Sequence, residues 1–201
     1  MEGGMEGGAA QAGGTAIPAI GGAALFNGDR LVGFAEELEA RGLRWALAPV
    51  ANQSIWVPAD GEGGFAITVS QTWPRLTVEE SQGRLQLRIS VEVEGDVTEL
   101  RGSVDSGSRA AVAELAALAA RHIEADIAAG VAYAESLQSD PLRVGLYLSR
   151  WHPALWRRLR ENWPRPLAET AHLIEVDVRI ITTGILSRNA PVGRTQTGAG
   201  P

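Results

Sequence analysis

The segment RLQLRISVEVEG, residues 84–95, alternates apolar and polar side chains without a break. Successive side chains of a β-strand point to opposite sides of the sheet, so the apolar set shares one face. A strand buried on both faces, as in a parallel sheet covered by helices, would instead show a continuous apolar run. The alternation therefore predicts antiparallel strands with one face on the core and the other in water. The apolar positions are Leu85, Leu87, Ile89, Val91 and Val93.

Other segments before the long helix continue this pattern. FAITVSQTW places Phe65, Ile67 and Val69 on one face, and SIWV before Pro58 is a shorter strand candidate. Asn27-Gly28 lies between two short apolar runs and predicts a tight hairpin turn, because both residues tolerate positive φ. These segments predict a sheet in which strands that follow one another in the sequence pair with each other.

The helical segments follow. Ser108, with Asp105 and Ser106, offers N-cap candidates for a long helix that runs to about Leu137, and its alanine-rich apolar line favours close packing on a sheet. An earlier helix is expected within FAEELEARGLRWALA, residues 34–48, and a further one after Asp140-Pro141. The order of strands, helical block and closing strand predicts an α+β domain. In it a mostly antiparallel sheet has one face covered by the long helix and the shorter C-terminal helices.

The closing strand is expected in HLIEVDVRIITTG, residues 172–184. Its core face should begin at Ile174, which would leave Glu175, Asp177 and Arg179 in solvent. The acidic residues Glu92 and Glu94 fall on the wet face of their own strand for the same reason.

WHPALWRRLRENWP, residues 151–164, combines three tryptophans with three arginines. If a helix begins at Pro153, His152 is its N-cap, and Trp151 and Trp156 have the spacing of a hydrophobic staple. The remaining tryptophans and leucines then share one face, while Arg157, Arg158 and Arg160 occupy the other. This geometry favours a packed helix with a solvated arginine face over a nucleic-acid groove or a membrane-surface helix.

Composition narrows the chemistry further. The net charge of -6 argues against a nucleic-acid partner. The chain has no cysteine and no lysine, which excludes thiol chemistry, disulfides and Schiff-base catalysis. His122, His152 and His172 show no metal-ligand spacing, and no hydrolase or phosphate-loop motif is present. We therefore expect no catalytic residue, no cofactor and no metal.

The chain divides into three parts by composition. Residues 1–21 are glycine-rich and predict a flexible leader, residues 22–187 form one compact domain, and residues 188–201 resemble the leader. No apolar run is long enough for a transmembrane segment, and the N-terminus has glutamates where a secretory signal would have positive charge. The chain on its own is expected to be soluble.

The ordered succession of motifs resembles the C-terminal domain of the Ger(x)C family, the C subunits of spore nutrient-germinant receptors. The similarity covers about residues 22–187. It is carried by AALFNGDRLVGFAEELEARGLRWAL, RLQLRISVEVEGDVTEL, the long helix, SDPLRVGLYL, WHPALWRRLRENWP and HLIEVDVRIITTGIL.

The resemblance implies a non-enzymatic subunit that works with two membrane partners, the A and B receptor subunits. In that family it is a lipoprotein on the outer face of the spore inner membrane. Set against this family, we expect the chain to be without the signal peptide, the lipid-accepting cysteine and the N-terminal domains that normally precede this one. It is expected to be an excised or separately encoded domain, or a degenerate copy. The family implies no catalytic residue.

Two surfaces are candidates for partner contacts, because charged rims set register and association rate in interfaces. One is the arginine face of Arg157, Arg158 and Arg160, and the other is the exposed strand face of Glu175, Asp177 and Arg179. Two alternatives stay open. The first is a small-ligand-binding or hydrolytic domain with a pocket between helices and sheet, and the second is membrane-surface binding by the tryptophan helix.

Overall fold

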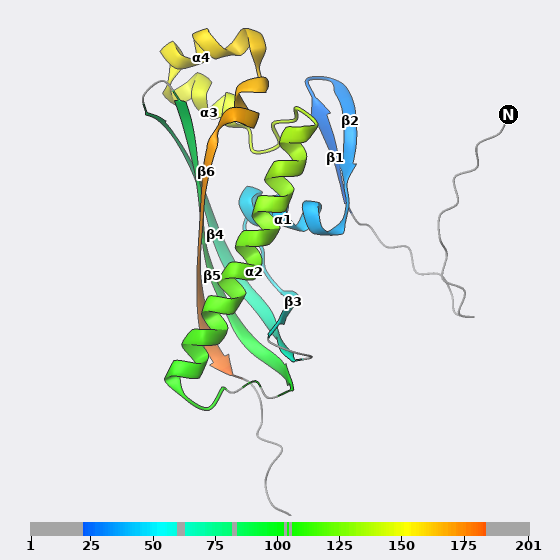
Figure 1. The fold of residues 1–201 in the computed structure, drawn as a ribbon, viewed down its shortest axis with the longest axis vertical. Coiled ribbons are helices and arrows are strands. Elements are labelled where there is room, and N and C mark those ends of the chain that lie inside the picture. Colours follow the sequence, from blue (N-terminus) through cyan, green and yellow to red (C-terminus); the bar gives the residue numbers. More distant parts are fainter. Residues whose placement is uncertain (1–21, 60–62, 82–83, 103, 105, 184–201) are drawn as a thin grey trace, which may run out of the picture.

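The computed structural model describes residues 22–59, 63–81, 84–102, 104 and 106–183. The predicted leader and the predicted tail lie outside these residues. A four-stranded sheet runs along the molecule with one long helix across its face, and a two-stranded hairpin stands beside that helix (Figure 1). The elements are β1 (Ala23–Asn27), β2 (Arg30–Ala35), α1 (Glu37–Leu47), β3 (Gln53–Pro58), β4 (Gly64–Ser81), β5 (Arg84–Arg101), α2 (Arg109–Ser136), α3 (Val144–Trp151), α4 (Pro153–Leu159), η1 (Arg160–Asn162), η2 (Arg165–Glu169) and β6 (Ala171–Thr183).

The larger sheet has the strand order β3-β4-β5-β6. β3–β4 and β4–β5 pair antiparallel, whereas β6 pairs parallel to β5. A parallel neighbour requires a long crossover connection, and α2 with the helices after it supplies that connection. The predicted α+β class with a mostly antiparallel sheet is confirmed, with one parallel pair that the alternation did not reveal.

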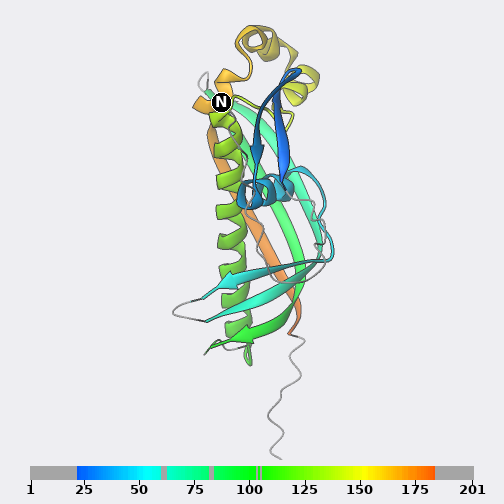
Figure 2. The ribbon, with the colours of Figure 1, turned by 90° about the vertical axis from the view of Figure 1, so that its right-hand side faces the viewer.

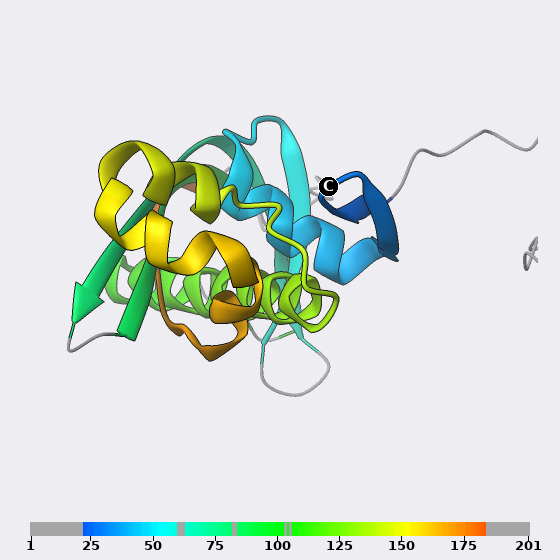
Figure 3. The same cartoon turned by 90° about the horizontal axis from the view of Figure 1, so that it is seen from above.

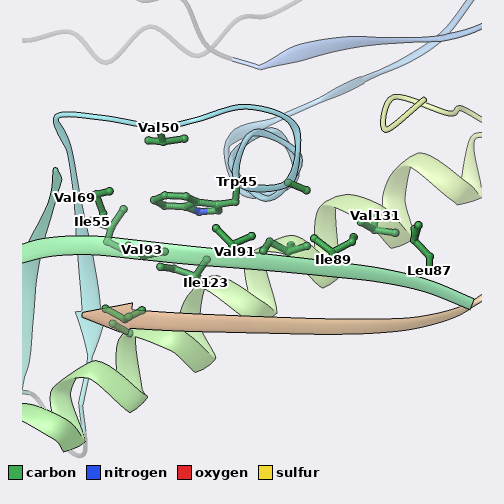
Figure 4. Packing of buried hydrophobic residues seen from close by; sticks show 14 of the residues in the cluster. Trp45, Val50, Ile55, Val69, Leu87, Ile89, Val91, Val93, Ile123 and Val131 are labelled. Atoms are coloured by element: carbon green, nitrogen blue, oxygen red, sulfur yellow. The ribbon is translucent and has the colours of Figure 1, made fainter. Parts of the chain in front are cut away.

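The predicted core face of the sheet is confirmed. The alternating apolar residues of β5 are buried, as are Phe65, Ile67 and Val69 of β4. They pack with Trp45 and Val50 from the α1 region and with Ile123 of α2 into one hydrophobic cluster (Figure 4). The polar residues between them lie on the opposite, uncovered face of the sheet.

Helix α2 extends along most of the length of the sheet (Figure 2). Of the three N-cap candidates the structure selects Ser108, whose Oγ accepts a hydrogen bond from the Ala111 amide at 3.1 Å. Ile123, Ile127 and Val131 are buried on its sheet-facing side, at the helical spacing that the sequence predicted.

The crossing of α1 and α2 depends on two glycines. A Cβ on Gly42 would lie 1.8 Å from the Asp126 carbonyl oxygen, and one on Gly130 would lie 2.6 Å from the Glu39 carbonyl oxygen. The backbones can therefore approach this closely only where both side chains are absent. Beside the crossing, Arg41 donates to both carboxylate oxygens of Asp126 at 2.7 and 2.9 Å. Asp126 is only 2% exposed, and its carboxylate raises the pKa of Arg41.

The β1–β2 hairpin differs in detail from its prediction. The two turn residues are Gly28 and Asp29, because Asn27 pairs with Arg30 at the end of the ladder. Of these turn residues only Gly28 has positive φ, at 63°. Phe34 was expected at the start of a helix but belongs to β2, where it is 62% exposed.

Two hydrogen bonds hold the hairpin against the C-terminal end of α2. Oγ of Ser139 donates to the Phe26 carbonyl at 2.7 Å, and the Tyr133 hydroxyl donates to the Phe34 carbonyl at 3.0 Å. The hairpin is thus attached through its backbone.

The residues between α2 and β6, numbers 137–170, form a helical cap at one end of the sheet (Figures 1 and 3). The prediction had placed these shorter helices on the face of the sheet. Val144, Leu148, Leu155 and Leu167 of the cap are buried in the main hydrophobic cluster. The cap therefore closes the end of the core, while α1 and α2 cover its face.

Within the cap, the predicted tryptophan helix is shorter than expected and its staple is wrong. α4 begins at Pro153, as predicted, but ends at Leu159 and continues as the 3-10 turn η1. His152 occupies the N-cap position without a side-chain cap bond. Trp151 is the last residue of α3 and is 70% exposed, so it does not pack on Trp156.

Candidate interaction surfaces

The predicted strand surface is exposed, but its charges are largely engaged with neighbouring strands. Glu175 accepts from Arg88 at 2.9 Å, and Arg179 pairs with Glu94 at 2.9 Å. Exposed pairs of this kind contribute about 0.2–1 kcal/mol each, and they neutralise one another. Asp177 is the exception: its register partner on β5 is Glu92, so two carboxylates lie side by side there.

The arginine face is exposed too, and its residues have fewer partners. Arg158 donates to Glu80 at 2.6 Å, which ties the cap to the end of β4. Arg157 and Arg160 are exposed and form no ion pair with any described residue. The two predicted surfaces therefore differ: the strand charges form cross-strand ion pairs, whereas two of the three residues of the arginine face form none with the described residues.

Asp140 organises the cap, and sequence reasoning did not identify this role. Its carboxylate accepts hydrogen bonds from the amides of Val144 and Gly145, both at 2.8 Å, and from Nε1 of Trp163 at 3.0 Å. Burial raises the pKa of Asp140, and the nearby N–H groups, those of Gly145 and Val144 first, partly offset that rise. An Asp-Pro pair just before a helix is the sequence signal that could have indicated this cap.

The Asp140 contact also fixes the two inward tryptophans. The rings of Trp156 and Trp163 meet edge to face, with centroids 5.4 Å apart. A Cβ on Gly145 would lie 2.7 Å from Nε1 of Trp163, so α3 packs directly against the indole. These two tryptophans are structural, in agreement with the packed-helix prediction.

A groove of about 830 Å³ separates the β1–β2 hairpin from the cap. Phe26 lies on its hairpin wall, Leu146 and Trp156 lie on its cap wall, and Arg143 and Arg160 add positive charge. The groove is open to solvent, and its walls are both polar and apolar. Such a shape suits an extended macromolecular contact better than the enclosure of a small molecule.

The space between helices and sheet is much smaller. A pocket of about 10 Å³ there is lined by Leu87, Val131 and Glu135 among others, which is room for about one water molecule. Near it, Nε2 of His172 lies 2.8 Å from Oε1 of Glu135, a pair joining β6 to α2. Among the described residues, no group of three His, Cys, Asp or Glu side chains could hold a metal ion.

None of the helices within the described ranges is both long enough and apolar enough to cross a membrane. The longest, α2, is 28 residues, but its polar positions interrupt any apolar window.

Comparison with known proteins agrees with this architecture. A solved structure titled "Crystal Structure of the GerBC protein" matches with a TM-score of 0.70 at 18% sequence identity. The match covers 80% of this chain and 51% of that chain, so this chain spans about half the length of the solved protein. No curated protein sequence matches. At this identity the likeness shows a shared fold.

The family comparison is more specific. The family model described as "Spore germination B3/ GerAC like, C-terminal" matches residues 21–184. That range contains every helix and strand of the structure. The chain therefore belongs to the spore germination B3/GerAC-like C-terminal family.

Proposed function

We propose that this chain acts in spore germination as a non-enzymatic, extramembrane domain of a germinant receptor C subunit. It contacts the A and B membrane subunits at the outer face of the spore inner membrane. The observation that carries this proposal is the family match over residues 21–184. The interior supports a non-enzymatic role, because the pocket of about 10 Å³ between helices and sheet leaves no room for a substrate.

Two exposed surfaces are the proposed contact regions for the A and B membrane subunits. The strand surface offers two acidic side chains, Glu175 and Asp177, followed by Arg179; Glu175 and Arg179 already pair with neighbouring strands, so Asp177 is the charge that a partner would meet unpaired. The arginine face of Arg157, Arg158 and Arg160 offers positive charge that the described chain only partly neutralises. Both lie apart from the buried core, so substitutions there should leave the fold intact.

The alternative, a small-ligand-binding or hydrolytic domain, is supported by less. Its predicted site between helices and sheet holds about one water molecule. The open groove between hairpin and cap is large enough for a ligand but is not enclosed. Protein contacts therefore account better for the exposed features than catalysis does.

The test is a pull-down from detergent-solubilised spore membranes with the tagged chain. Recovery of the A or B subunits, identified by mass spectrometry, would support the proposal. Charge reversal at Glu175, Asp177 and Arg179 should lower that recovery if the strand surface is the interface. The matched control reverses Asp29, Glu114 and Arg109, two acids and one arginine that are exposed elsewhere, so it changes the net charge equally. Absence of both subunits with a folded wild-type chain would contradict the proposal.

The arginine face is tested in the same pull-down. Lower recovery after charge reversal at Arg157, Arg158 and Arg160 would place a receptor subunit on it. Unchanged recovery in detergent would remove this face from the protein interface.

A further inference from the structure

The helical cap carries a charge opposite to that of the rest of the chain. Residues 137–170 contain six arginines and three acidic residues, whereas the other residues contain twelve arginines and twenty-one acidic residues. One of the three cap acids, Asp140, is turned inward to accept hydrogen bonds from the cap itself. A protein of net charge -6 thus presents one strongly positive end.

The cap arginines also lack the ion pairs that four arginines of the larger sheet form. On the sheet, Arg75, Arg88, Arg101 and Arg179 each pair with a glutamate. All six cap arginines are exposed, and only Arg158 forms an ion pair with a described residue. The other five are Arg143, Arg150, Arg157, Arg160 and Arg165. Their charge is available to an external anionic surface.

An exposed indole lies in the middle of this positive charge. Trp151 is 70% exposed, the largest fraction among the exposed large apolar side chains. It sits at the corner between α3 and α4, next to Arg150 and close in sequence to Arg157. Leu146, one turn and a half earlier on α3, is exposed as well. We call Leu146, Arg150, Trp151, Arg157 and Arg160 the cationic tip.

The position of the tip suits a planar target. α3 and α4 form the end of an elongated molecule, away from the end where β6 finishes (Figures 1 and 3). Trp151 ends α3 and α4 begins at Pro153, so Arg150, Trp151 and Arg157 all belong to the helices at this end of the molecule. A peptide in the concave groove beside the hairpin would meet Leu146 and Arg160, but not Arg150, Trp151 or Arg157, which do not line that groove.

We propose that the cationic tip docks on the headgroup region of an anionic lipid bilayer, with the Trp151 ring at the interface. Tryptophan favours this depth because its ring is apolar and its N–H can stay hydrated. Each arginine near an anionic surface strengthens binding about five-fold. The inference assigns Arg157 and Arg160 to lipid and so competes with a receptor-subunit contact at the arginine face, whereas it is compatible with subunit binding at the strand surface.

Vesicle co-sedimentation of the full 201-residue chain tests it. The probes are vesicles of phosphatidylglycerol mixed equally with phosphatidylcholine, and vesicles of phosphatidylcholine alone. We expect binding to the first and not to the second, with loss at high salt because salt screens the attraction. Trp151 should shift the emission to shorter wavelength on binding, and the shift should disappear in W151F.

Variants separate local charge from net charge. R150Q/R157Q/R160Q should weaken binding roughly a hundred-fold, since three arginines are lost. R75Q/R109Q/R121Q changes net charge equally at exposed positions outside the cap and should bind like wild type. W151A should weaken binding, and thermal unfolding would confirm that each variant folds. Arg158 is left in place because it pairs with Glu80.

Two results would overturn the inference. One is failure of the wild-type chain to bind phosphatidylglycerol vesicles at low salt. The other is equal weakening by the cap and control triple variants, which would show a net-charge effect. If R150Q/R157Q/R160Q also abolished recovery of receptor subunits in detergent, where no bilayer is present, the tip would be a protein interface instead. Loss of vesicle binding with normal subunit recovery would support lipid contact.

Discussion

The substitution Gly42→Ala tests the account of how α1 crosses α2. The added Cβ would lie 1.8 Å from the Asp126 carbonyl oxygen, and such contacts are essentially never shorter than 3.0 Å. The helices must therefore separate locally by about 1.2 Å to accommodate one methyl group. The obstacle is backbone in a helix, so no side-chain rotation relieves the clash.

The magnitude follows from three contributions. Overpacking in a well-packed interior costs about 1–3 kcal/mol. Separation of the helices also strains the contact of Arg41 with the buried Asp126, and complete loss of such a pair costs about 3–5 kcal/mol. Alanine regains about 1 kcal/mol over glycine in helix propensity. We expect a net loss of about 2–5 kcal/mol in the free energy of unfolding.

The assay is thermal and denaturant unfolding of the wild-type chain and the variant, followed by circular dichroism. A loss of this size lowers Tm by roughly 5–15 °C in a domain of this length. The matched control is A128G on the exposed side of α2, which measures helix propensity alone and should cost about 1 kcal/mol. An unchanged or raised Tm for G42A would refute the reasoning, because propensity would then outweigh the crossing.

Three further predictions concern buried polar groups. T72V removes the hydroxyl that accepts a hydrogen bond from the Val50 amide at 2.8 Å and should lower the free energy of unfolding by about 1–3 kcal/mol. T72S keeps the hydroxyl and should lower it less; equal losses for the two variants in denaturant unfolding would point to packing instead. D126A removes the carboxylate that pairs with Arg41 and should lower the free energy of unfolding by about 3–5 kcal/mol. A double-mutant cycle with R41A should show strong coupling, and additive losses would contradict the pairing. Because burial raises the pKa of Asp140 in the folded state, its contribution to stability is present below about pH 4 and is lost as the pH rises through the folded pKa. The stability of wild type relative to D140N should therefore increase as the pH falls from 7, and a decrease would show that the N–H donors dominate.

Much of the fold could be predicted from local patterns. The alternation of residues 84–95 assigned the buried and wet faces of β5, and Ser108 marked the start of α2. These features depend on neighbours within a few residues, so periodicity and capping reveal them. The parallel pairing of β6 with β5 could not be predicted, because the alternation of apolar and polar residues shows which face of a strand is buried but not the direction of its neighbour.

The candidate surfaces were harder to predict. The sequence located Arg157, Arg158 and Arg160 on a solvated face, and the structure leaves all three exposed. It could not show that Glu175 and Arg179 meet Arg88 and Glu94, since those partners are some 85 residues away in the chain. The staple prediction for Trp151 was wrong because Trp151 is the last residue of α3 and not a residue of the loop before α4. In that position its ring lies in solvent.

The sequence by itself determined which side chains must be buried, where the long helix begins and which chemistries are missing, because composition and periodicity are local properties. Only the tertiary structure decided how closely α1 crosses α2, which arginines are neutralised and that the Trp151 ring lies in solvent. Each of these depends on distances between segments far apart in the chain. Gly42 shows the difference. In the sequence it is a residue that weakens a helix, whereas in the fold its missing side chain allows the backbones of α1 and α2 to come into contact.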